Sequence, residues 1–283
     1  MSDHVPVRVA FLGTGKMAGA MARRVAAAGH DVLLWNRTAS RASAVGTGTV
    51  MATPADAAAE AELVLLALTG PNAVESVIDQ VLPAAAGKVF VDMTTAGAHV
   101  LERSGPRLEE LGAWLIVAPV FGSLPAVEAG KLLIMVGEDA DPAAFERARP
   151  VLESFGEVTR VPTTREAVGI KLLVNAMLFV SSLAAAELVA TGTRSGVARE
   201  HSFAVLTRLA PHLAARSASF LESVHEPVTF RLADVVKDLD LALEHFRSAG
   251  ASMPVTALAR ELYAELAGAY GDAEMTAVIE RYL

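Results

Sequence analysis

The sequence predicts an α/β domain with a doubly wound, mostly parallel sheet, followed by a domain made only of helices. Two observations lead to this prediction. Short apolar runs alternate with helical patterns up to about residue 162, and only helical patterns follow from Thr163 onward. We therefore expect a first domain over residues 1–162 and a second over residues 163–283. No low-complexity linker lies between them, so we expect a long helix to join the two domains.

The stretch from Val7 to Thr38 predicts a complete strand, glycine turn, helix and second strand. In the turn, Ala18 takes the third glycine position of the dinucleotide-binding pattern, where a small residue suffices. The helix after such a turn directs its N–H groups and its positive dipole end toward a pyrophosphate, so the unit is typical of a Rossmann-type domain. The residues expected to bind the dinucleotide here are Gly13, Thr14, Gly15, Lys16 and Met17.

The second strand, Asp31–Trp35, ends in Asn36, Arg37 and Thr38. Many such units have an acidic residue at this place, which binds the ribose 2′-hydroxyl and would repel the 2′-phosphate of NADP. Arg37 is instead a permanent cation whose planar fork suits phosphate oxygens, and Thr38 adds a hydroxyl donor. We therefore expect these residues to bind the cofactor, and we predict NADP(H) over NAD(H).

The remaining elements follow from the same patterns. Further strands are predicted at Leu63–Leu68, Lys88–Met93, Trp114–Val117, Leu132–Val136 and Val158–Val161, with helices at His99–Leu111 and Pro142–Phe155. The second domain is predicted to contain a long helix from Thr163 to about Thr191, broken by Gly192 and Gly196, and helices near Arg199–Ser217, Leu232–Ser248 and Val255–Gly268. Ligands of open α/β sheets bind beyond the carboxyl ends of the strands. We count Leu68 and Thr69 among the cofactor-binding residues, and we expect the helical domain to close over this edge.

Lys171 stands out on the long apolar helix, because helical spacing places it on one face with Asn175, Leu178 and Ser182. A lysine in apolar surroundings is costly unless it meets a cleft, an acceptor or a charge partner, and it loses its proton more easily. Such a group can give a proton to a carbonyl oxygen while hydride arrives at the carbon. The alternative is a lysine whose stem packs and whose head reaches solvent.

Several motifs in order resemble the β-hydroxyacid dehydrogenase family, which includes 3-hydroxyisobutyrate dehydrogenases and the NADPH-dependent glyoxylate/succinic semialdehyde reductases. These motifs are GTGKMAGAMA in the opening turn, NRT after the second strand, VDMTT at Val91–Thr95, APVFGSLPAVEAGKL at Ala118–Leu132, KLLVN at Lys171–Asn175 and KDLDLA at Lys237–Ala242. The resemblance implies that Lys171 is the catalytic acid/base and that Asn175 assists it. It also implies that Thr94, Thr95, Gly122 and Ser123 meet substrate or nicotinamide, and that Lys237 reaches the cofactor.

The chain also departs from that family. Phe121 replaces a small serine in the loop near the substrate, which suggests a less polar or larger substrate, and Arg165 and Ala167 replace two glycines before Lys171. Arg165 is either an anchor for a carboxylate or a surface residue at the start of the helix. Thr94 and Thr95 have the alternative role of helix caps, and Lys237 that of a solvated surface lysine.

These residues favour an NADPH-dependent oxidoreductase that interconverts a small semialdehyde or 2-oxo acid and its hydroxy acid. An imine reductase and a non-catalytic NADP(H)-binding protein remain alternatives. The residues expected to contact the substrate are Thr94, Thr95, Phe121, Gly122, Ser123 and Lys171.

The composition limits the kinds of molecule that the protein could bind. The net charge of −8 argues against nucleic acid, and the absence of cysteine excludes disulfides and thiol chemistry. The scattered histidines predict no metal site. The uncharged stretch Leu172–Ala186 is shorter than the roughly 20 residues of a membrane span, and Met1–Pro6 lacks the start of a signal peptide. We expect a cytoplasmic enzyme with a small-molecule substrate, and the apolar long helix suggests a homodimer or a larger homo-oligomer.

Overall fold

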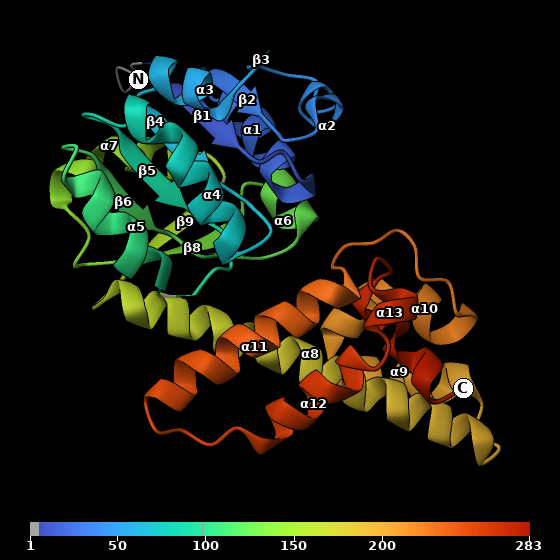
Figure 1. Cartoon of the computed structure of the whole chain (residues 1–283). Coiled ribbons are helices and arrows are strands. Elements are labelled where there is room, and N and C mark those ends of the chain that lie inside the picture. Colours follow the sequence, from blue (N-terminus) through green and yellow to red (C-terminus); the bar gives the residue numbers. More distant parts are fainter. Residues whose placement is uncertain (1–5, 98) are drawn as a thin grey trace. The chain divides into compact units, whose positions relative to one another are not determined.

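The computed structural model describes residues 6–97 and 99–283, and the N-terminal segment used in the targeting prediction lies almost entirely outside these residues. The chain divides into two compact units, one that extends to Lys171 and one from Leu172 to Leu283. We call them the N-terminal unit and the C-terminal unit (Figure 1). The division falls inside the long helix α8 (Thr164–Arg194).

The N-terminal unit is built on a six-stranded parallel sheet in the order β3-β2-β1-β4-β5-β6. The strands are β1 (Arg8–Leu12), β2 (Asp31–Trp35), β3 (Thr49–Val50), β4 (Leu63–Leu66), β5 (Val89–Asp92) and β6 (Trp114–Val117). Strand order reverses beside β1, since the chain runs outward to β3 and then crosses back to β4. This is the Rossmann-type architecture expected from the sequence, and it places the carboxyl ends of β1, β2, β4 and β5 along one edge.

Helices pack on both faces of this sheet (Figure 1). They are α1 (Lys16–Ala27), α2 (Ala39–Ser43), α3 (Pro54–Glu60), α4 (Pro71–Val81), α5 (His99–Glu109), α6 (Leu124–Glu128) and α7 (Pro142–Glu153). Alternate residues of β1 enter different cores: Val9 and Phe11 pack in a cluster with α1 and α7, and Ala10 and Leu12 pack in one with α3, α4 and α5. Both faces of the central strand are therefore fully buried, as in other parallel sheets.

The predicted strands at Leu132–Val136 and Val158–Val161 do not extend the parallel sheet. They belong to a separate three-stranded sheet, in which β8 (Leu132–Gly137) pairs antiparallel with β7 (Val120–Phe121) and parallel with β9 (Gly156–Val161). Pro119 lies between β6 and β7 and has no N–H to donate to a neighbouring strand. The large sheet ends at β6, and β7 pairs with β8 in the second sheet.

The turn after β1 depends on Gly13. Its φ of +104° lies in a region that other residues rarely adopt, and its N–H donates to the Trp35 carbonyl at 2.9 Å. A Cβ at this position would lie 2.4 Å from the Ala67 carbonyl oxygen in the loop after β4. At Gly15, in contrast, an added Cβ would meet nothing within 4 Å. The first glycine is needed for the fold, whereas the second leaves open space in front of α1.

The C-terminal unit contains only helices, as expected; α11 has the predicted bounds, whereas the bounds of the others differ from the prediction. They are α8 beyond Lys171, α9 (Arg199–Leu209), η2 (Pro211–Arg216), α10 (Ser217–Glu222), α11 (Leu232–Ser248), α12 (Pro254–Ala264), α13 (Ala267–Tyr270) and η3 (Met275–Arg281). Gly192 lies inside α8 and does not break it, and the chain turns at Gly196, where φ is +85°. The predicted helix over Arg199–Ser217 is split because Pro211 cannot continue it.

Helix α8 is apolar but belongs to a protein core for much of its length. By length and composition alone it could cross a membrane, yet half of its most apolar window is buried inside the protein. Phe179 is fully buried in the core of the C-terminal unit, where its carbonyl accepts a hydrogen bond from the Tyr263 hydroxyl at 3.0 Å. An apolar helix buried in this way is typical of a globular core.

One carboxyl group is buried at the end of β5. Asp92 is 1% exposed, and its Oδ1 accepts a hydrogen bond from the Thr94 N–H at 2.9 Å. Burial disfavours the charged carboxylate and raises the pKa of Asp92 to about 6, against a weaker opposing effect of the hydrogen bonds with Thr94. The native state therefore binds a proton here more tightly than the unfolded chain does.

We predict that Gly13→Ala destabilises the protein clearly more than Gly15→Ala does. A non-glycine residue at the φ of Gly13 costs about 1–3 kcal/mol from backbone strain alone, and overlap with the Ala67 carbonyl adds to this cost. Gly15→Ala has space and an ordinary φ of −64°. It loses only the preference for glycine over alanine at an N-cap, which should cost no more than about 1 kcal/mol. Denaturant unfolding of the two variants measures the difference, and equal losses would contradict this account of the turn.

We also predict that Asp92→Asn gains stability relative to the wild type as the pH rises. Because the native pKa is raised, the stability contributed by protonated Asp92 is fully present below the unfolded pKa of 3.8 and is lost as the pH rises through about 6. The variant cannot lose this contribution, so its relative gain between acidic and neutral pH should approach about 3 kcal/mol at most. Urea unfolding at several pH values tests this. A difference between the two proteins that does not change with pH would show the prediction to be wrong.

Candidate functional site

The glycine turn and the start of α1 form one end of the candidate site. Gly15 is exposed and is the N-cap of the 12-residue helix α1, whose first-turn N–H groups have no partners within the helix. Thr14 is 7% exposed, and its hydroxyl has no hydrogen-bond partner among the described residues. Lys16 is exposed, whereas Met17 packs against the core. A backbone that is open at Gly15 and leads into a helix fits a dinucleotide pyrophosphate.

The loop after β2 is held by a hydrogen bond to the Asn36 side chain within the loop. Asn36 Oδ1 accepts a hydrogen bond from the Thr38 N–H at 2.9 Å, which forms an Asx turn around Arg37. Arg37 is exposed at the apex of this turn, and Thr38 is the N-cap of α2 without a side-chain cap bond. The turn therefore presents a cation and a hydroxyl group at the carboxyl end of β2, where the sequence predicted them.

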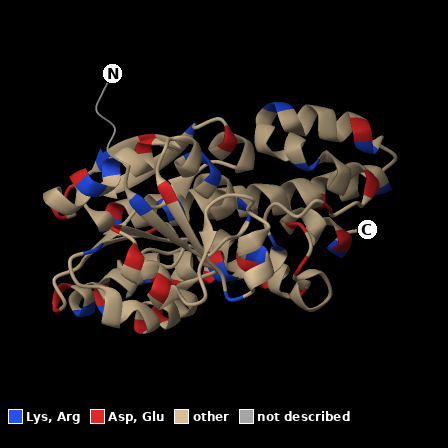
Figure 2. Cartoon of the chain, turned by 90° about the horizontal axis from the view of Figure 1, so that it is seen from above, with Lys and Arg blue, Asp and Glu red and all other residues tan. Residues whose placement is uncertain are grey.

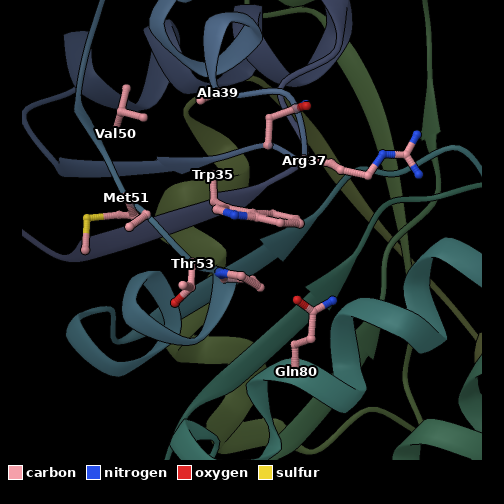
Figure 3. Close-up of a pocket in the computed structure, with 10 residues that line it drawn as sticks. Trp35, Arg37, Ala39, Val50, Met51, Thr53 and Gln80 are labelled. Atoms are coloured by element: carbon pink, nitrogen blue, oxygen red, sulfur yellow. The ribbon is translucent and has the colours of Figure 1, made fainter.

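A pocket of about 470 Å³ lies next to this turn. Figure 3 shows the Trp35 indole in it, with the Gln80 side chain directed toward the ring from α4. The lining residues are Trp35, Asn36, Arg37, Ala39, Val50, Met51, Ala52, Thr53, Pro54 and Gln80. Apolar walls with a few polar groups, in a volume of this size, suit a flat heterocycle such as adenine. Apart from Asn36 and Arg37, the sequence analysis missed these residues as part of a site, because they come from five separate elements, β2, α2, β3, α3 and α4, and from the segment between β3 and α3, and share no pattern.

The loops after β4 and β5 are joined by a hydrogen bond. The Leu68 N–H donates to Thr94 Oγ1 at 3.0 Å, and Thr94 is 7% exposed. The capping role considered for Thr94 is wrong, since its hydroxyl accepts from Leu68 and α5 begins only at His99. Thr69 is exposed and Thr95 is half-buried at the same edge of the sheet.

Lys171 lies against β7. Its Nζ donates to the Val120 carbonyl at 3.0 Å and lies 5.2 Å from the centre of the Phe121 ring. The side chain is half-buried, so its ammonium group is held by the protein and does not simply extend into solvent. Of the neighbouring predicted residues, Gly122 has a φ of +136°, and Ser123 is the exposed N-cap of α6. The N-terminal unit thus brings Lys171 and Phe121 together.

The replaced glycines before Lys171 have different surroundings. Ala167 is fully buried. The Arg165 side chain is 62% exposed, and its guanidinium nitrogen lies 3.8 Å from a carboxylate oxygen of Glu102 on α5. An exposed pair of this kind contributes little to stability. Arg165 is therefore a surface residue at the start of α8.

A second polar cluster lies in the C-terminal unit. Asn175 is 5% exposed and donates from Nδ2 to Asp238 Oδ2 at 2.7 Å. Lys237 Nζ pairs with the other oxygen, Oδ1, of the same carboxylate. The Lys237 side chain is 28% exposed, so the alternative of a solvated surface lysine is wrong.

Asp238 is the residue that the sequence analysis overlooked in this cluster. It is 2% exposed and occupies a position of the apolar stripe that α11 turns toward the core through Val235, Leu239 and Ala242. An aspartate at a core position of an amphipathic helix is expensive unless it is paired. That signal was available in the sequence, although its partner Asn175 lies 63 residues earlier in the chain.

Charged residues of both signs are interspersed along the ribbons of both units (Figure 2). Among residues 6–97 and 99–283, no group of three or more His, Asp or Glu side chains could hold a metal ion.

Comparison with known proteins places both units in families. Residues 8–168 match the NAD binding domain of 6-phosphogluconate dehydrogenase, and residues 166–282 match the NAD-binding domain of NADP-dependent 3-hydroxyisobutyrate dehydrogenase. A glyoxylate/succinic semialdehyde reductase 2 of Arabidopsis thaliana is 30% identical over 97% of this chain and 79% of its own length.

Solved structures of related proteins support the same family assignment. The Mycobacterium tuberculosis 3-hydroxyisobutyrate dehydrogenase with L-serine matches 98% of this chain and 99% of its own, with a TM-score of 0.81 and 28% identity. A Streptomyces aurantiacus imine reductase matches 97% of this chain and 99% of its own, with a TM-score of 0.62 and 24% identity, and so shares the fold. The chain therefore belongs to the NAD(P)-dependent hydroxyacid dehydrogenase family, with the 3-hydroxyisobutyrate dehydrogenases and the glyoxylate/succinic semialdehyde reductases among its relatives.

Proposed function

We propose that this protein is an NADPH-dependent reductase that interconverts a small semialdehyde or 2-oxo acid and its hydroxy acid, with Lys171 as the proton donor and acceptor. The observation that carries the proposal is the position of the Lys171 ammonium group, which donates to the Val120 carbonyl beside the Phe121 ring. The relatives named as semialdehyde reductase and hydroxyisobutyrate dehydrogenase support the same substrate class.

The cofactor proposal rests on the turn after β2. An exposed arginine at the end of this strand, together with the absence of a carboxylate there, favours a 2′-phosphate over a 2′-hydroxyl. The adjacent pocket suits the adenine ring, and the open backbone at Gly15 suits the pyrophosphate. When bound, NADPH supplies the hydride that reduces the carbonyl carbon.

Lys171 would supply the proton. In the reductive direction its ammonium donates a proton to the carbonyl oxygen, and in the oxidative direction the neutral amine takes the proton from the hydroxyl group. The Val120 carbonyl restrains the long, flexible side chain, which reduces the entropy lost when the ammonium group is aligned.

Asn175 and Lys237 would be oriented by Asp238. The carboxylate accepts from the Asn175 amide with one oxygen and pairs with Lys237 with the other. Because Asn175 Nδ2 is committed to Asp238, its amide oxygen is fixed in the opposite direction and can accept a hydrogen bond. We propose that Asn175 assists Lys171 and that Lys237 binds the cofactor.

We further propose that the protein forms a homodimer or a larger homo-oligomer. Leu173, Met177 and Leu188 lie along one side of α8 and are 50%, 69% and 56% exposed. Large apolar side chains in a row on a helix surface favour contact with another chain. In this proposal a second copy covers them.

An imine reductase is the second candidate, because of Phe121. Its ring lies beside the Lys171 ammonium group, where a substrate carboxylate would lose hydration without gaining a donor from the ring. An apolar imine would fit such surroundings better. Reduction of a carbonyl group to an alcohol needs a proton donor, and Lys171 can supply the proton. The presence of Lys171 therefore favours a carbonyl reductase over an imine reductase.

We predict that Arg37→Ala weakens NADPH binding about 10- to 100-fold and leaves NADH binding nearly unchanged. A charge-assisted hydrogen bond is worth about 1.5–3 kcal/mol, and only NADPH carries the phosphate that would accept it. Titration of protein fluorescence with each cofactor measures the two affinities. Arg149→Ala, which removes the same charge from α7, is the control. An Arg37 variant that still prefers NADPH as strongly as the wild type would contradict the proposal.

We predict that Lys171→Ala lowers kcat by about 10²- to 10⁴-fold, the usual contribution of general acid catalysis, while NADPH affinity stays within about threefold. Lys131→Ala, which removes an exposed lysine outside the candidate site, should keep full activity.

The assay follows NADPH oxidation with glyoxylate, succinic semialdehyde and one cyclic imine. Unchanged turnover of the carbonyl substrates in the Lys171 variant would refute its role as proton donor. Wild-type turnover of the imine alone would favour the second candidate.

A further inference from the structure

Asp92 is a buried carboxyl group that takes no part in the proton transfer proposed for Lys171. The other residues of β5, Val89–Val91, are fully buried and apolar, and Asp92 ends the strand with 1% exposure. In the parallel ladder it lies between Leu66 of β4 and Val117 of β6, in the interior of the sheet. Its Oδ2 has no hydrogen-bond partner among the described residues. A carboxyl group at such a position lowers stability at neutral pH, where burial opposes its charge.

The other oxygen of Asp92 begins a chain of contacts along the carboxyl edge of the sheet. Oδ1 accepts from the Thr94 N–H at 2.9 Å, and the Thr94 hydroxyl in turn accepts from the Leu68 N–H at 3.0 Å. Ala67, the residue before Leu68, directs its carbonyl oxygen at Gly13, within 2.4 Å of where a Cβ would lie. The glycine turn after β1, the loop after β4 and the segment after β5 are therefore in continuous contact.

We propose that Asp92 is a positioning residue, which fixes the Thr94–Thr95 segment against the loop after β4 and thereby sets the place of the nicotinamide end of the cofactor. The inference rests on the proposed function in one respect, that this edge of the sheet binds NADPH. Asp92 does not touch the reacting atoms in this account. It acts through the backbone of Thr94 and through the hydrogen bond between Thr94 and Leu68.

The buried N–H of Thr94 explains why the chain keeps the Asp92 carboxyl group at a position where its burial is costly. Without Asp92 Oδ1 the Thr94 N–H would be buried and unpaired, a loss of about 1–3 kcal/mol, and the segment could relieve it only by moving. Movement would break the Leu68 bond and displace Thr95, which is predicted to meet nicotinamide or substrate. The pyrophosphate turn and Arg37 would keep their own backbone supports, which are the bond from the Gly13 N–H to the Trp35 carbonyl and the Asx turn of Asn36. A loss of Asp92 should therefore affect catalysis more than cofactor affinity.

Three variants separate positioning from a mere contribution to folding. Asp92→Ala removes the acceptor, Thr94→Val removes the hydroxyl that holds Leu68, and Asp92→Asn keeps an acceptor at the place of Oδ1 while removing the charge. Each is examined without cofactor by hydrogen–deuterium exchange of the Leu68 amide. Each is then assayed for NADPH affinity and for kcat well below its melting temperature.

We expect Asp92→Ala and Thr94→Val to speed exchange at Leu68 about tenfold or more, and Asp92→Asn to stay within about threefold of the wild type. We expect kcat to fall about tenfold in Asp92→Ala and in Thr94→Val, and to remain nearly unchanged in Asp92→Asn. The NADPH affinity of all three variants should stay within about threefold of the wild type. If Asp92 acted through its charge, Asp92→Asn would lose activity as Asp92→Ala does. Normal activity of Asp92→Asn would therefore show that the hydrogen-bond acceptor matters and the charge does not.

Two results would overturn the inference. One is an Asp92→Asn variant as inactive as Asp92→Ala although its Leu68 amide remains protected. The other is a Thr94→Val variant with wild-type exchange at Leu68 and wild-type kcat, a result that also decides the matter if Asp92→Ala fails to fold. If the wild type itself oxidises no NADPH with any carbonyl compound, the proposed function fails, and the exchange rates alone still decide whether Asp92 positions the segment.

Discussion

The structure of the candidate site depends on the close approach of Gly13 to the Ala67 carbonyl. Strand β1 pairs with β2 on one side and β4 on the other, so the chain leaving β1 must turn in the narrow space between two neighbouring loops. Only a residue without a side chain fits there, and only a glycine adopts the required φ without strain. The resulting turn directs α1 along the face of the sheet and leaves its N-terminus open at Gly15. The site proposed for a pyrophosphate is thus a consequence of how three parallel strands pack.

Two buried carboxyl groups organise the polar residues, one in each unit. In the N-terminal unit Asp92 holds the backbone of Thr94, and in the C-terminal unit Asp238 holds Asn175 and Lys237. Each lies at a position where neighbouring residues are apolar. A buried carboxyl group costs free energy unless it is paired, and the bonds that pair these two orient the side chains and loops that the proposed chemistry needs. Lys171 is restrained differently, by a main-chain carbonyl and an aromatic ring.

The parts that sequence could predict are those encoded by short spacing. The β1–α1–β2 unit and the turn at Asn36–Thr38 follow from glycine spacing and from local hydrogen bonding, and the structure has both where they were expected. The separate sheet of β7, β8 and β9 was not predicted, because an apolar run does not reveal which strand it pairs with. Gly192 was expected to end α8. Its cost of about 1 kcal/mol in a helix is small beside the packing of a helix this long.

Other parts of the site depend on contacts between distant residues. The bond between Asn175 and Asp238, the bond between Leu68 and Thr94, and the pocket beside Trp35 each join elements that only the fold brings together. Sequence could identify several of these residues by their resemblance to a family, but it could not show what holds them. The family resemblance itself is confirmed, since both units match family models over nearly the whole chain.

The central claim is that the turn after β2 binds the 2′-phosphate of NADP(H) through Arg37. Phosphorus NMR of bound NADP⁺ as a function of pH tests this contact directly. A free phosphate monoester has its second pKa at about 6, and contact with an arginine favours the dianion. We predict that the 2′-phosphate resonance of the bound cofactor keeps its dianionic position to below about pH 5.5. A bound phosphate that titrates at about pH 6, as in free solution, would contradict the account.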